Sequence, residues 1–216
     1  GSEMCIRDRL VGIRPSRTYK FLIITTPVGH YYSEPVNVKI EKSYTRAASG
    51  GVGRAKAAGN YAASMYPALQ AQKEGFHQLV WTDAAEHKYI EESGTMNIVF
   101  QIGDKLITPD ENHDTILRGI TKRSVFEIAE KWGIEVEERM ITVAEIIEAA
   151  KNGSLKDAFG AGTAATIAPI AMIGYEDEKY MLPPVEERLL SNKIKKYLGD
   201  LKTGRIADEF GWNLLV

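Results

Sequence analysis

Short apolar runs alternate along the chain with longer stretches of helical spacing, and this pattern predicts a mixed α and β fold. The first dense run is Tyr19–Val28, whose aromatic and β-branched residues predict a buried strand ended by Pro27 and Gly29. Gly103-Asp104 predicts a turn between two later strands. The other expected strands are Val36–Ile40, Leu79–Thr82, Tyr89–Glu91, Met96–Gln101 and Lys105–Thr108.

The predicted helices and strands do not follow a strict strand–helix–strand order along the chain. Thr142 and Glu145 have the spacing of a capping box, which marks a helix start. Irregular alternation of this kind favours an α+β fold with a mixed, barrel-like sheet and helices outside it. The segments with helical propensity or spacing are Tyr61–Lys73, Ile120–Trp132, Thr142–Ala150 and Glu186–Leu201.

One uncharged segment, Ala158–Tyr175, approaches the length that spans a bilayer. Three glycines and Pro169 interrupt it, so we interpret it as a Gly-rich turn followed by a buried strand and expect no membrane insertion. The net charge of −2 argues against nucleic-acid binding. Cys5 is the only cysteine, which excludes an intrachain disulfide and favours a reducing, cytoplasmic location. The four histidines lack metal-ligand spacing, so we expect no metal site.

The candidate chemistry begins at Lys56, which lies in a stretch of glycine and alanine and precedes Tyr61 by five residues. Small neighbours leave room for a flat ligand and allow a lysine to point inward. Burial favours the neutral amine, which forms Schiff bases with carbonyl compounds. A flexible surface turn is the alternative interpretation of this stretch.

Three further segments add candidate groups. Glu92 begins the Glu92–Asn97 segment and is either a pocket carboxylate or a surface glutamate. Ile116–Lys122 opens a predicted helix, whose free N–H groups suit a phosphate or form an ordinary helix start. Gly160–Ala164 is either an anion cradle or a tight turn. A lysine, a carboxylate and two clusters of N–H groups together match the requirements of pyridoxal 5'-phosphate.

These motifs resemble those of class IV pyridoxal-phosphate enzymes, and within that class the branched-chain amino acid aminotransferases. The resemblance covers roughly residues 13 to 216. It rests on Glu92-x-Gly94-Thr95-x-Asn97, Leu106-Ile107-Thr108, Leu117-x-Gly119-Ile120-Thr121-Lys122, and the lysine block from Gly51 to Tyr61. Further matching positions are Arg14-Pro15-Ser16, Thr26–Gly29, Tyr44–Ala47 and Gly211-Trp212.

The resemblance implies a role for each residue around the cofactor ring. Lys56 is the implied Schiff-base lysine and proton shuttle. Tyr61 is expected to hydrogen-bond the phenolic oxygen of the cofactor, Glu92 to pair with the ring nitrogen, and Leu117 to pack on the ring face.

The same resemblance assigns the anionic groups. Ile120 and Thr121 are expected to bind the cofactor phosphate through backbone N–H groups, and Thr121 also through its hydroxyl. Thr163 is expected to complete the phosphate site. The N–H groups of Thr163 and Ala164 are expected to bind the substrate carboxylate.

In domain terms, the resemblance predicts that most of the chain is the large, pyridoxal-phosphate-binding domain. We expect residues 1–12 to be a tag-like leader, 13–40 the end of a small domain with the interdomain segment, and 41–216 the large domain. Family members carry a complete small domain before Arg14-Pro15-Ser16, so the sequence is expected to be truncated.

The implied parent reaction transfers the amino group of Leu, Ile or Val to 2-oxoglutarate in a homodimer, with activity reduced by the truncation. Two alternatives stay open. The chain is an inactive, self-associating fragment, or it belongs to another class IV enzyme: a D-amino acid or amine transaminase, or an aminodeoxychorismate lyase.

Overall fold

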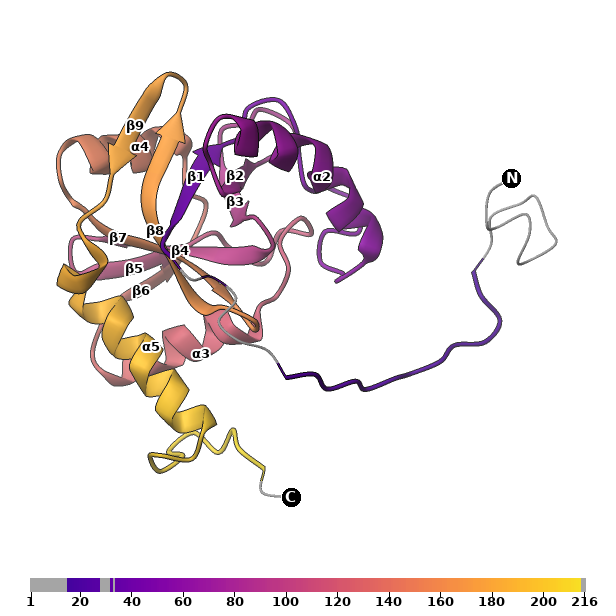
Figure 1. Ribbon diagram of the computed structural model, residues 1–216, viewed down its shortest axis with the longest axis vertical. Helices are drawn as coiled ribbons and strands as arrows, with labels where there is room; N and C mark the ends of the chain where they lie inside the picture. The colour runs from indigo at the N-terminus through magenta and orange to yellow at the C-terminus, as the bar shows by residue number, and fades with distance from the viewer. Residues whose placement is uncertain (1–14, 28–31, 33, 215–216) are drawn as a thin grey trace.

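The computed structural model describes residues 15–27, 32 and 34–214 (Figure 1). Within them the chain forms nine strands, four α-helices and one short 3-10 helix. The strands are β1 (Val36–Ile40), β2 (Gln78–Thr82), β3 (Ile90–Ser93), β4 (Met96–Ile102), β5 (Lys105–Thr108), β6 (Val136–Glu138), β7 (Leu155–Gly162), β8 (Thr166–Tyr175) and β9 (Glu178–Met181). The helices are α2 (Ala58–Lys73), α3 (Ile120–Lys131), α4 (Val143–Lys151), the 3-10 helix η1 (Val185–Glu187) and α5 (Leu189–Lys202).

The strands form one mixed sheet that closes on itself. Its path runs β3-β2-β1-β8-β7-β4, and the β3–β4 hairpin completes the ring. β5 and β6 continue the sheet beyond β4, and β9 pairs with β8. β1 runs parallel to both β2 and β8, whereas the other pairs within the ring are antiparallel. The expected α+β fold with a mixed, barrel-like sheet is confirmed.

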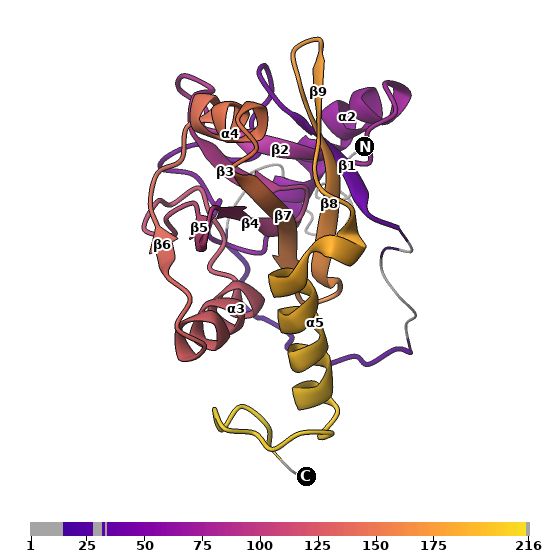
Figure 2. The same ribbon diagram turned by 90° about the vertical axis from the view of Figure 1, so that its left-hand side faces the viewer.

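The helices lie on the outside of this sheet (Figures 1 and 2). α3 and α5 pack together against β7 and β8, and their buried residues join one cluster with Val99 and Phe159. α4 covers β7 and β9, while α2 packs on β2. Burial of these apolar faces is the main source of stability, since each fully buried large side chain contributes about 1.5–3 kcal/mol.

Most of the predicted elements are present, with boundaries that shift by a few residues. β1 and β5 coincide with their predicted ranges. The Thr142 hydroxyl accepts a hydrogen bond from the Glu145 N–H at the start of α4, as expected of a cap. α2 begins three residues before Tyr61 and continues through Pro67, which is buried. Tertiary packing therefore stabilises a turn in which proline removes a backbone hydrogen bond.

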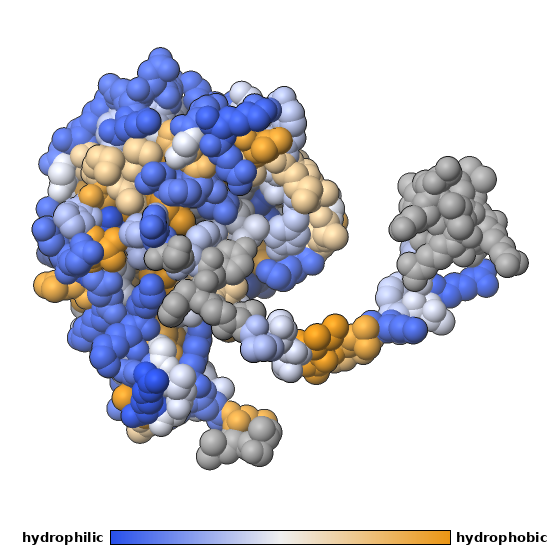
Figure 3. All heavy atoms as spheres, viewed as in Figure 1, coloured by the Kyte–Doolittle hydropathy of each residue, from blue (hydrophilic) through white to orange (hydrophobic). Residues whose placement is uncertain are grey.

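The predicted buried strand at Tyr19–Val28 is wrong. Residues 19–27 form no strand, and Val28 lies outside the described residues. The large apolar residues of this segment are 73% to 87% exposed, and the segment extends away from the sheet (Figure 1) and forms an apolar stretch on an extended arm (Figure 3). An apolar run forms a strand only when another strand pairs with it, and no strand in the described part of the chain pairs with this segment.

The interpretation of Ala158–Tyr175 is partly wrong. Its first five residues belong to β7, and a short turn leads to β8, so the segment holds two antiparallel strands. Glycines fit inside β7 because Met96 fills the space beside them: a Cβ at Gly160 would lie 2.6 Å from the Met96 methyl group. Two short strands, the partly buried β6 and the mostly exposed β9, were not predicted. In the described part of the chain no helix is long and apolar enough to cross a membrane.

A buried ion pair attaches α5 to the sheet. Arg188 Nη1 lies 2.9 Å from Asp157 Oδ1, and both side chains are 1% exposed. Arg188 Nε also donates to the carbonyl of Pro183. The pair connects β7 to the segment that precedes α5, and removing one partner leaves a buried charge without compensation.

We expect Asp157→Ala to lower the free energy of unfolding by about 3 kcal/mol or more, since Arg188 would then be buried and unpaired. Urea denaturation followed by circular dichroism measures this. Lys42→Ala, which removes an exposed partner of Glu176, is the control and should leave the midpoint nearly unchanged. Equal effects of the two substitutions would contradict the structural role of the pair.

Candidate functional site

Two adjoining pockets contain all eight residues that the sequence nominated. The first, of about 250 Å³, is lined by Lys56, Glu92, Leu117, Ile120, Thr121 and Thr163. The second, of about 500 Å³, is lined by Lys56, Tyr61, Thr163 and Ala164. Lys56 and Thr163 line both pockets, so the two form one continuous site beside the β3–β4 hairpin and the N-terminus of α3.

The loop that carries Lys56 is fixed by its neighbours. The buried Asn60 side chain donates to the carbonyls of Val52 and Ala55, 2.8 and 2.9 Å away. Gly53 packs so closely that an added Cβ would lie 2.6 Å from Thr115 Cα. Glycine is therefore required at this position, and the lysine loop is held against residues 111–115.

The expectation that Lys56 is buried is wrong: its side chain is exposed. Its Nζ lies 5.7 Å from the centre of the Tyr61 ring, at the wall shared by the two pockets. The small residues around Lys56 are themselves mostly exposed, so they give the amine access to the pockets without covering it.

Glu92 is the buried acid of the site, with 3% of its side chain exposed. Its Oε1 accepts hydrogen bonds from the Leu117 N–H at 2.7 Å and from Asn97 Nδ2 at 3.3 Å. Its Oε2 lies 3.1 Å from Nε of Arg46, which is also buried. The carboxylate is thus oriented from β4, from the loop before α3 and from the segment before Lys56.

Burial controls the protonation of Glu92. Desolvation raises the pKa of its carboxyl from 4.5 to about 7, against the opposing effects of Arg46 and the Leu117 N–H. The neighbouring Glu91 carboxylate raises this pKa further, and the Lys56 charge lowers it. A carboxyl group with a pKa near neutrality, at the wall of a pocket, is typical of a functional site.

The N-terminus of α3 forms the opposite wall of the first pocket. Thr121 is buried there, and the first turn of α3 contains no acidic residue and no side-chain cap. Its free N–H groups and positive dipole end suit an anion. A Cβ at Gly119 would lie 1.8 Å from Asn97 Oδ1, so a larger residue would displace the Asn97 side chain from its place beside Glu92.

The Gly-rich segment has two parts. Gly160 and Gly162 lie in β7, whereas Thr163 and Ala164 form an exposed turn that closes the pockets. The next residue but one, Thr166, has a positive φ of 59°, a strained conformation for a β-branched residue. Lys202 of α5 donates to its hydroxyl at 3.0 Å, so α5 contacts the end of this turn.

Sequence reasoning assigned no role to Arg46 or Asn97. The β3–β4 hairpin pairs Glu92 with Asn97, so the two-residue turn at Gly94-Thr95 could have revealed that Asn97 is a neighbour of Glu92. No local signal could have placed Arg46 beside Glu92, because 46 positions separate them. Arg46 also donates to the carbonyls of Thr115 and Gly53.

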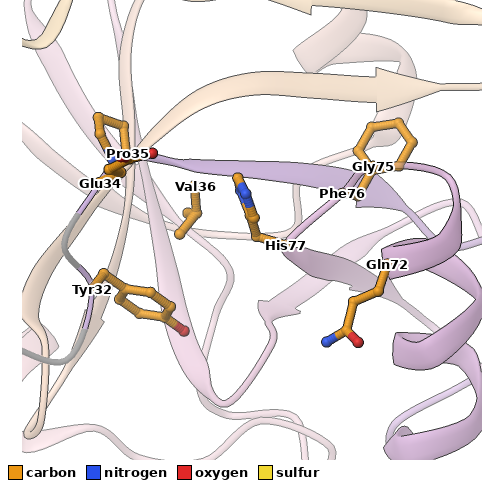
Figure 4. A pocket seen from close by; sticks show the side chains of 8 residues that line it. All are labelled: Tyr32, Glu34, Pro35, Val36, Gln72, Gly75, Phe76 and His77. Carbon is orange, nitrogen blue, oxygen red and sulfur yellow. The ribbon is translucent and has the colours of Figure 1, made fainter.

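A further pocket, of about 480 Å³, shares no residue with these two and lies where β1 meets the end of α2 (Figure 4). Its labelled side chains include Tyr32, Gln72 and His77. No polar side chain in its lining is buried, so the pocket offers little to orient a ligand.

Comparison with known proteins places the chain in a family. The amino-transferase class IV family matches residues 7–173, more than half of the chain. The chain belongs to the class IV aminotransferase family. All eight nominated residues lie within the matched range, and so do Arg46 and Asn97.

Its relatives carry consistent names. The chain is 44% identical to "Branched-chain-amino-acid aminotransferase 2" of Bacillus subtilis (strain 168) over 98% of its own length and 61% of that protein. It is 41% identical to a "Probable branched-chain-amino-acid aminotransferase" of Staphylococcus aureus (strain MRSA252) over 97% of its length and 59% of the relative. The chain therefore spans about three fifths of the length of these relatives.

Solved structures agree in fold. A branched-chain aminotransferase of Thermoproteus uzoniensis with norvaline superposes with a TM-score of 0.72 and 28% identity, covering 87% of this chain and 58% of that one. The enzyme of Thermobaculum terrenum in its PLP form gives a TM-score of 0.65 and 26% identity, covering 80% and 52%.

We expect the raised pKa of Glu92 to make the stability of the chain without added cofactor depend on pH. Because the folded pKa exceeds the unfolded value of 4.5, this contribution is fully present below pH 4.5 and is lost as the pH rises to about 7. The expected loss is about 3 kcal/mol. Glu92→Gln keeps the shape of the side chain and removes the titration.

Urea unfolding of the wild type and of Glu92→Gln is measured between pH 4.5 and 7. The effect is the difference between their free energies of unfolding at each pH. Other buried acids titrate in both chains and cancel, and the unpaired Arg46 of the variant adds a constant offset. A difference that does not change with pH would show that Glu92 is ionised throughout.

Proposed function

We propose that the Lys56 site binds pyridoxal 5'-phosphate and that the chain is the cofactor-binding part of a branched-chain amino acid transaminase. The proposed reaction moves the amino group of L-leucine, L-isoleucine or L-valine to 2-oxoglutarate. The observation that carries the proposal is the meeting of an accessible lysine, a buried carboxyl and a free helix N-terminus around one pocket.

The residues of the site fit this cofactor. The Glu92 carboxyl is held by Arg46, Leu117 and Asn97 so that it can face a pyridinium nitrogen. The first turn of α3 offers N–H groups and the Thr121 hydroxyl to a phosphate, with no acidic residue to repel it. Gly119 allows the backbone before α3 to lie close to the Asn97 side chain.

The bound cofactor would supply an electron sink for the carbanion formed at the substrate Cα. In this proposal Lys56 holds the cofactor through its amine and then takes and returns the proton at the substrate Cα. Glu92 keeps the ring nitrogen protonated by pairing with it as a carboxylate. Tyr61 donates to the phenolic oxygen, and Leu117 packs on the ring face.

The anionic groups are assigned to backbone donors. The N–H groups of Ile120 and Thr121 bind the phosphate, together with the Thr121 hydroxyl and Thr163. The N–H groups of Thr163 and Ala164 bind the substrate carboxylate. Their exposed turn lines the larger pocket, which leaves room for an amino acid or 2-oxo acid beside Lys56.

The substrate class rests on the relatives. The B. subtilis and S. aureus proteins are named for branched-chain amino acids, and the T. uzoniensis structure contains norvaline, an unbranched isomer of valine. We further propose that the protein is a homodimer and that it is located in the cytoplasm. The reducing cytoplasm is in keeping with the single cysteine. Residues 41–216 form the proposed large domain and 13–40 the end of a small one, while residues 1–12 lie outside the described residues.

A second candidate is an inactive, self-associating protein. The apolar segment from Tyr19 to Ile24 favours it, because its large side chains are 73% to 87% exposed and such surfaces promote association. Light scattering over a range of concentrations separates the two candidates. A concentration-independent dimer that binds the cofactor supports the transaminase, whereas growing aggregates without cofactor binding support the alternative.

Covalent capture tests the cofactor proposal directly. When pyridoxal 5'-phosphate is added and the mixture is reduced with borohydride, we expect mass spectrometry to find one phosphopyridoxyl group per chain, on the peptide that contains Lys56. Lys56→Ala should lose this labelling, because it removes the amine that lines both pockets. Lys73→Ala, at the far end of α2, is the matched control and should be labelled like the wild type.

Labelling spread over several lysines, and unchanged in Lys56→Ala, would contradict the proposal. Transfer of an amino group from leucine to 2-oxoglutarate, measured as glutamate formed, then tests the reaction itself. Cofactor capture without transfer would limit the function to cofactor binding.

A further inference from the structure

The first turn of α3 contains a lysine that no step above uses. Lys122 is 0% exposed, although it directly follows Thr121, which lines the first pocket. Consecutive helical residues point about 100° apart, so Thr121 faces the pocket while Lys122 enters the protein. A fully buried lysine is costly unless acidic partners compensate its charge.

Two acidic residues from different segments compensate Lys122. Its Nζ lies 2.8 Å from Glu111 Oε2, in the loop that follows β5, and 3.2 Å from Glu138 Oε1, at the end of β6. Glu111 also pairs with Arg123, the next residue of α3, at 3.0 Å. Burial alone would raise the pKa of the Glu111 carboxyl, but Lys122 and Arg123 together lower it below its usual value, so Glu111 is ionised at neutral pH. The Lys122 cluster thus joins α3, the preceding loop and the edge of the sheet.

The other end of the same loop is fixed at the site. Leu117 donates its N–H to Glu92 and accepts a hydrogen bond from Asn97 through its carbonyl. The start of α3 is therefore held on one side by Glu92 and on the other by Glu111 and Glu138. Of these two polar attachments, the Lys122 cluster is the one that includes a residue of the helix, since Leu117 lies three residues before it. The later turns of α3 are held separately by their apolar face.

We propose that Lys122 is a positioning residue for the cofactor phosphate. Its ion pairs fix the first turn of α3, so that the N–H groups of Ile120 and Thr121 and the Thr121 hydroxyl converge on one point in the pocket. The inference rests on the proposed function, because the anion that it concerns is the phosphate of pyridoxal 5'-phosphate.

A comparison of two ligands tests this role. Pyridoxal 5'-phosphate and pyridoxal share the aldehyde and ring and differ in the phosphate. In Lys122→Met, which keeps a long side chain, we expect the dissociation constant for the phosphate form to rise on the order of tenfold, the effect of losing one charged hydrogen bond. Pyridoxal binding should stay within about twofold of wild type, because the groups around Lys56 and Glu92 are unchanged.

Control variants separate positioning from general damage. Lys122→Arg keeps the charge and should restore most of the affinity. Lys131→Met, at the exposed end of α3, should bind both ligands like the wild type. Loss of affinity for both ligands in Lys122→Met would overturn the proposal, since it would indicate loosening of the whole site. Equal affinity of variant and wild type would also overturn it.

Glu111→Gln separates positioning from simple charge attraction. Removing a negative charge near the phosphate would tighten binding if Lys122 acted only through its field. If Lys122 positions α3, the weakened ion pair should instead weaken binding of the phosphate form. Tighter binding in Glu111→Gln would overturn the positioning role. This variant also covers the case in which Lys122→Met fails to fold.

A titration with inorganic phosphate tests the positioning role even if the proposed function is wrong. If the wild-type chain fails to bind pyridoxal 5'-phosphate, the proposed function fails. The amide signals of Ile120 and Thr121 are then followed by nuclear magnetic resonance during a phosphate titration. Shifts in the wild type that are weaker in Lys122→Met support the positioning of α3, and their absence in the wild type overturns it.

Discussion

The buried ion pair between Arg46 and Glu92 is the interaction on which the rest of the site depends. Both side chains are almost inaccessible to water, and Arg46 is the main group that opposes the desolvation of the Glu92 carboxylate. Nη2 of Arg46 also donates to the carbonyls of Gly53 and Thr115. One guanidinium group therefore connects the strand of the acid, the loop of the lysine and the loop that leads to α3.

Each part of the site is attached to this pair by backbone hydrogen bonds rather than by side chains alone. Glu92 receives the N–H of Leu117, and Asn97 donates to the Leu117 carbonyl. The lysine loop is joined to the same region through Gly50, whose N–H donates to Asp114, 2.6 Å away. The relative positions of acid, lysine and helix N-terminus are thus fixed by these hydrogen bonds around the Arg46–Glu92 pair, and preorganisation of this kind is what binding and catalysis require.

The sequence correctly predicted the helices and strands that are determined by neighbouring residues. The alternation of Val36–Ile40 and the cap at Thr142 needed only neighbouring residues, and the structure confirms both. The segment from Tyr19 to Val28 has an equally strong strand pattern, but a strand also needs a partner, which local sequence does not supply. Strands as short as Val136–Glu138, with one apolar residue, contain too few apolar positions to form a recognisable pattern.

The sequence nominated eight residues that the structure brings together, but it did not reveal the contacts that assemble them. All eight nominated residues border one continuous site, because the motifs carry the chemistry. The structure of the chain contradicted the burial of Lys56, and it revealed Arg46 and Lys122, which act through contacts with residues far away in sequence. Such contacts follow from the topology of the sheet, which cannot be deduced from the periodicity of the sequence alone.

The most direct test of this site is a crystal structure of the chain grown with pyridoxal 5'-phosphate. The structure described here predicts electron density continuous with Lys56 Nζ, a ring nitrogen facing Glu92, and a phosphate at the N-terminus of α3. Density for the cofactor elsewhere, or a ring nitrogen turned away from an unchanged Arg46–Glu92 pair, would contradict the central claim.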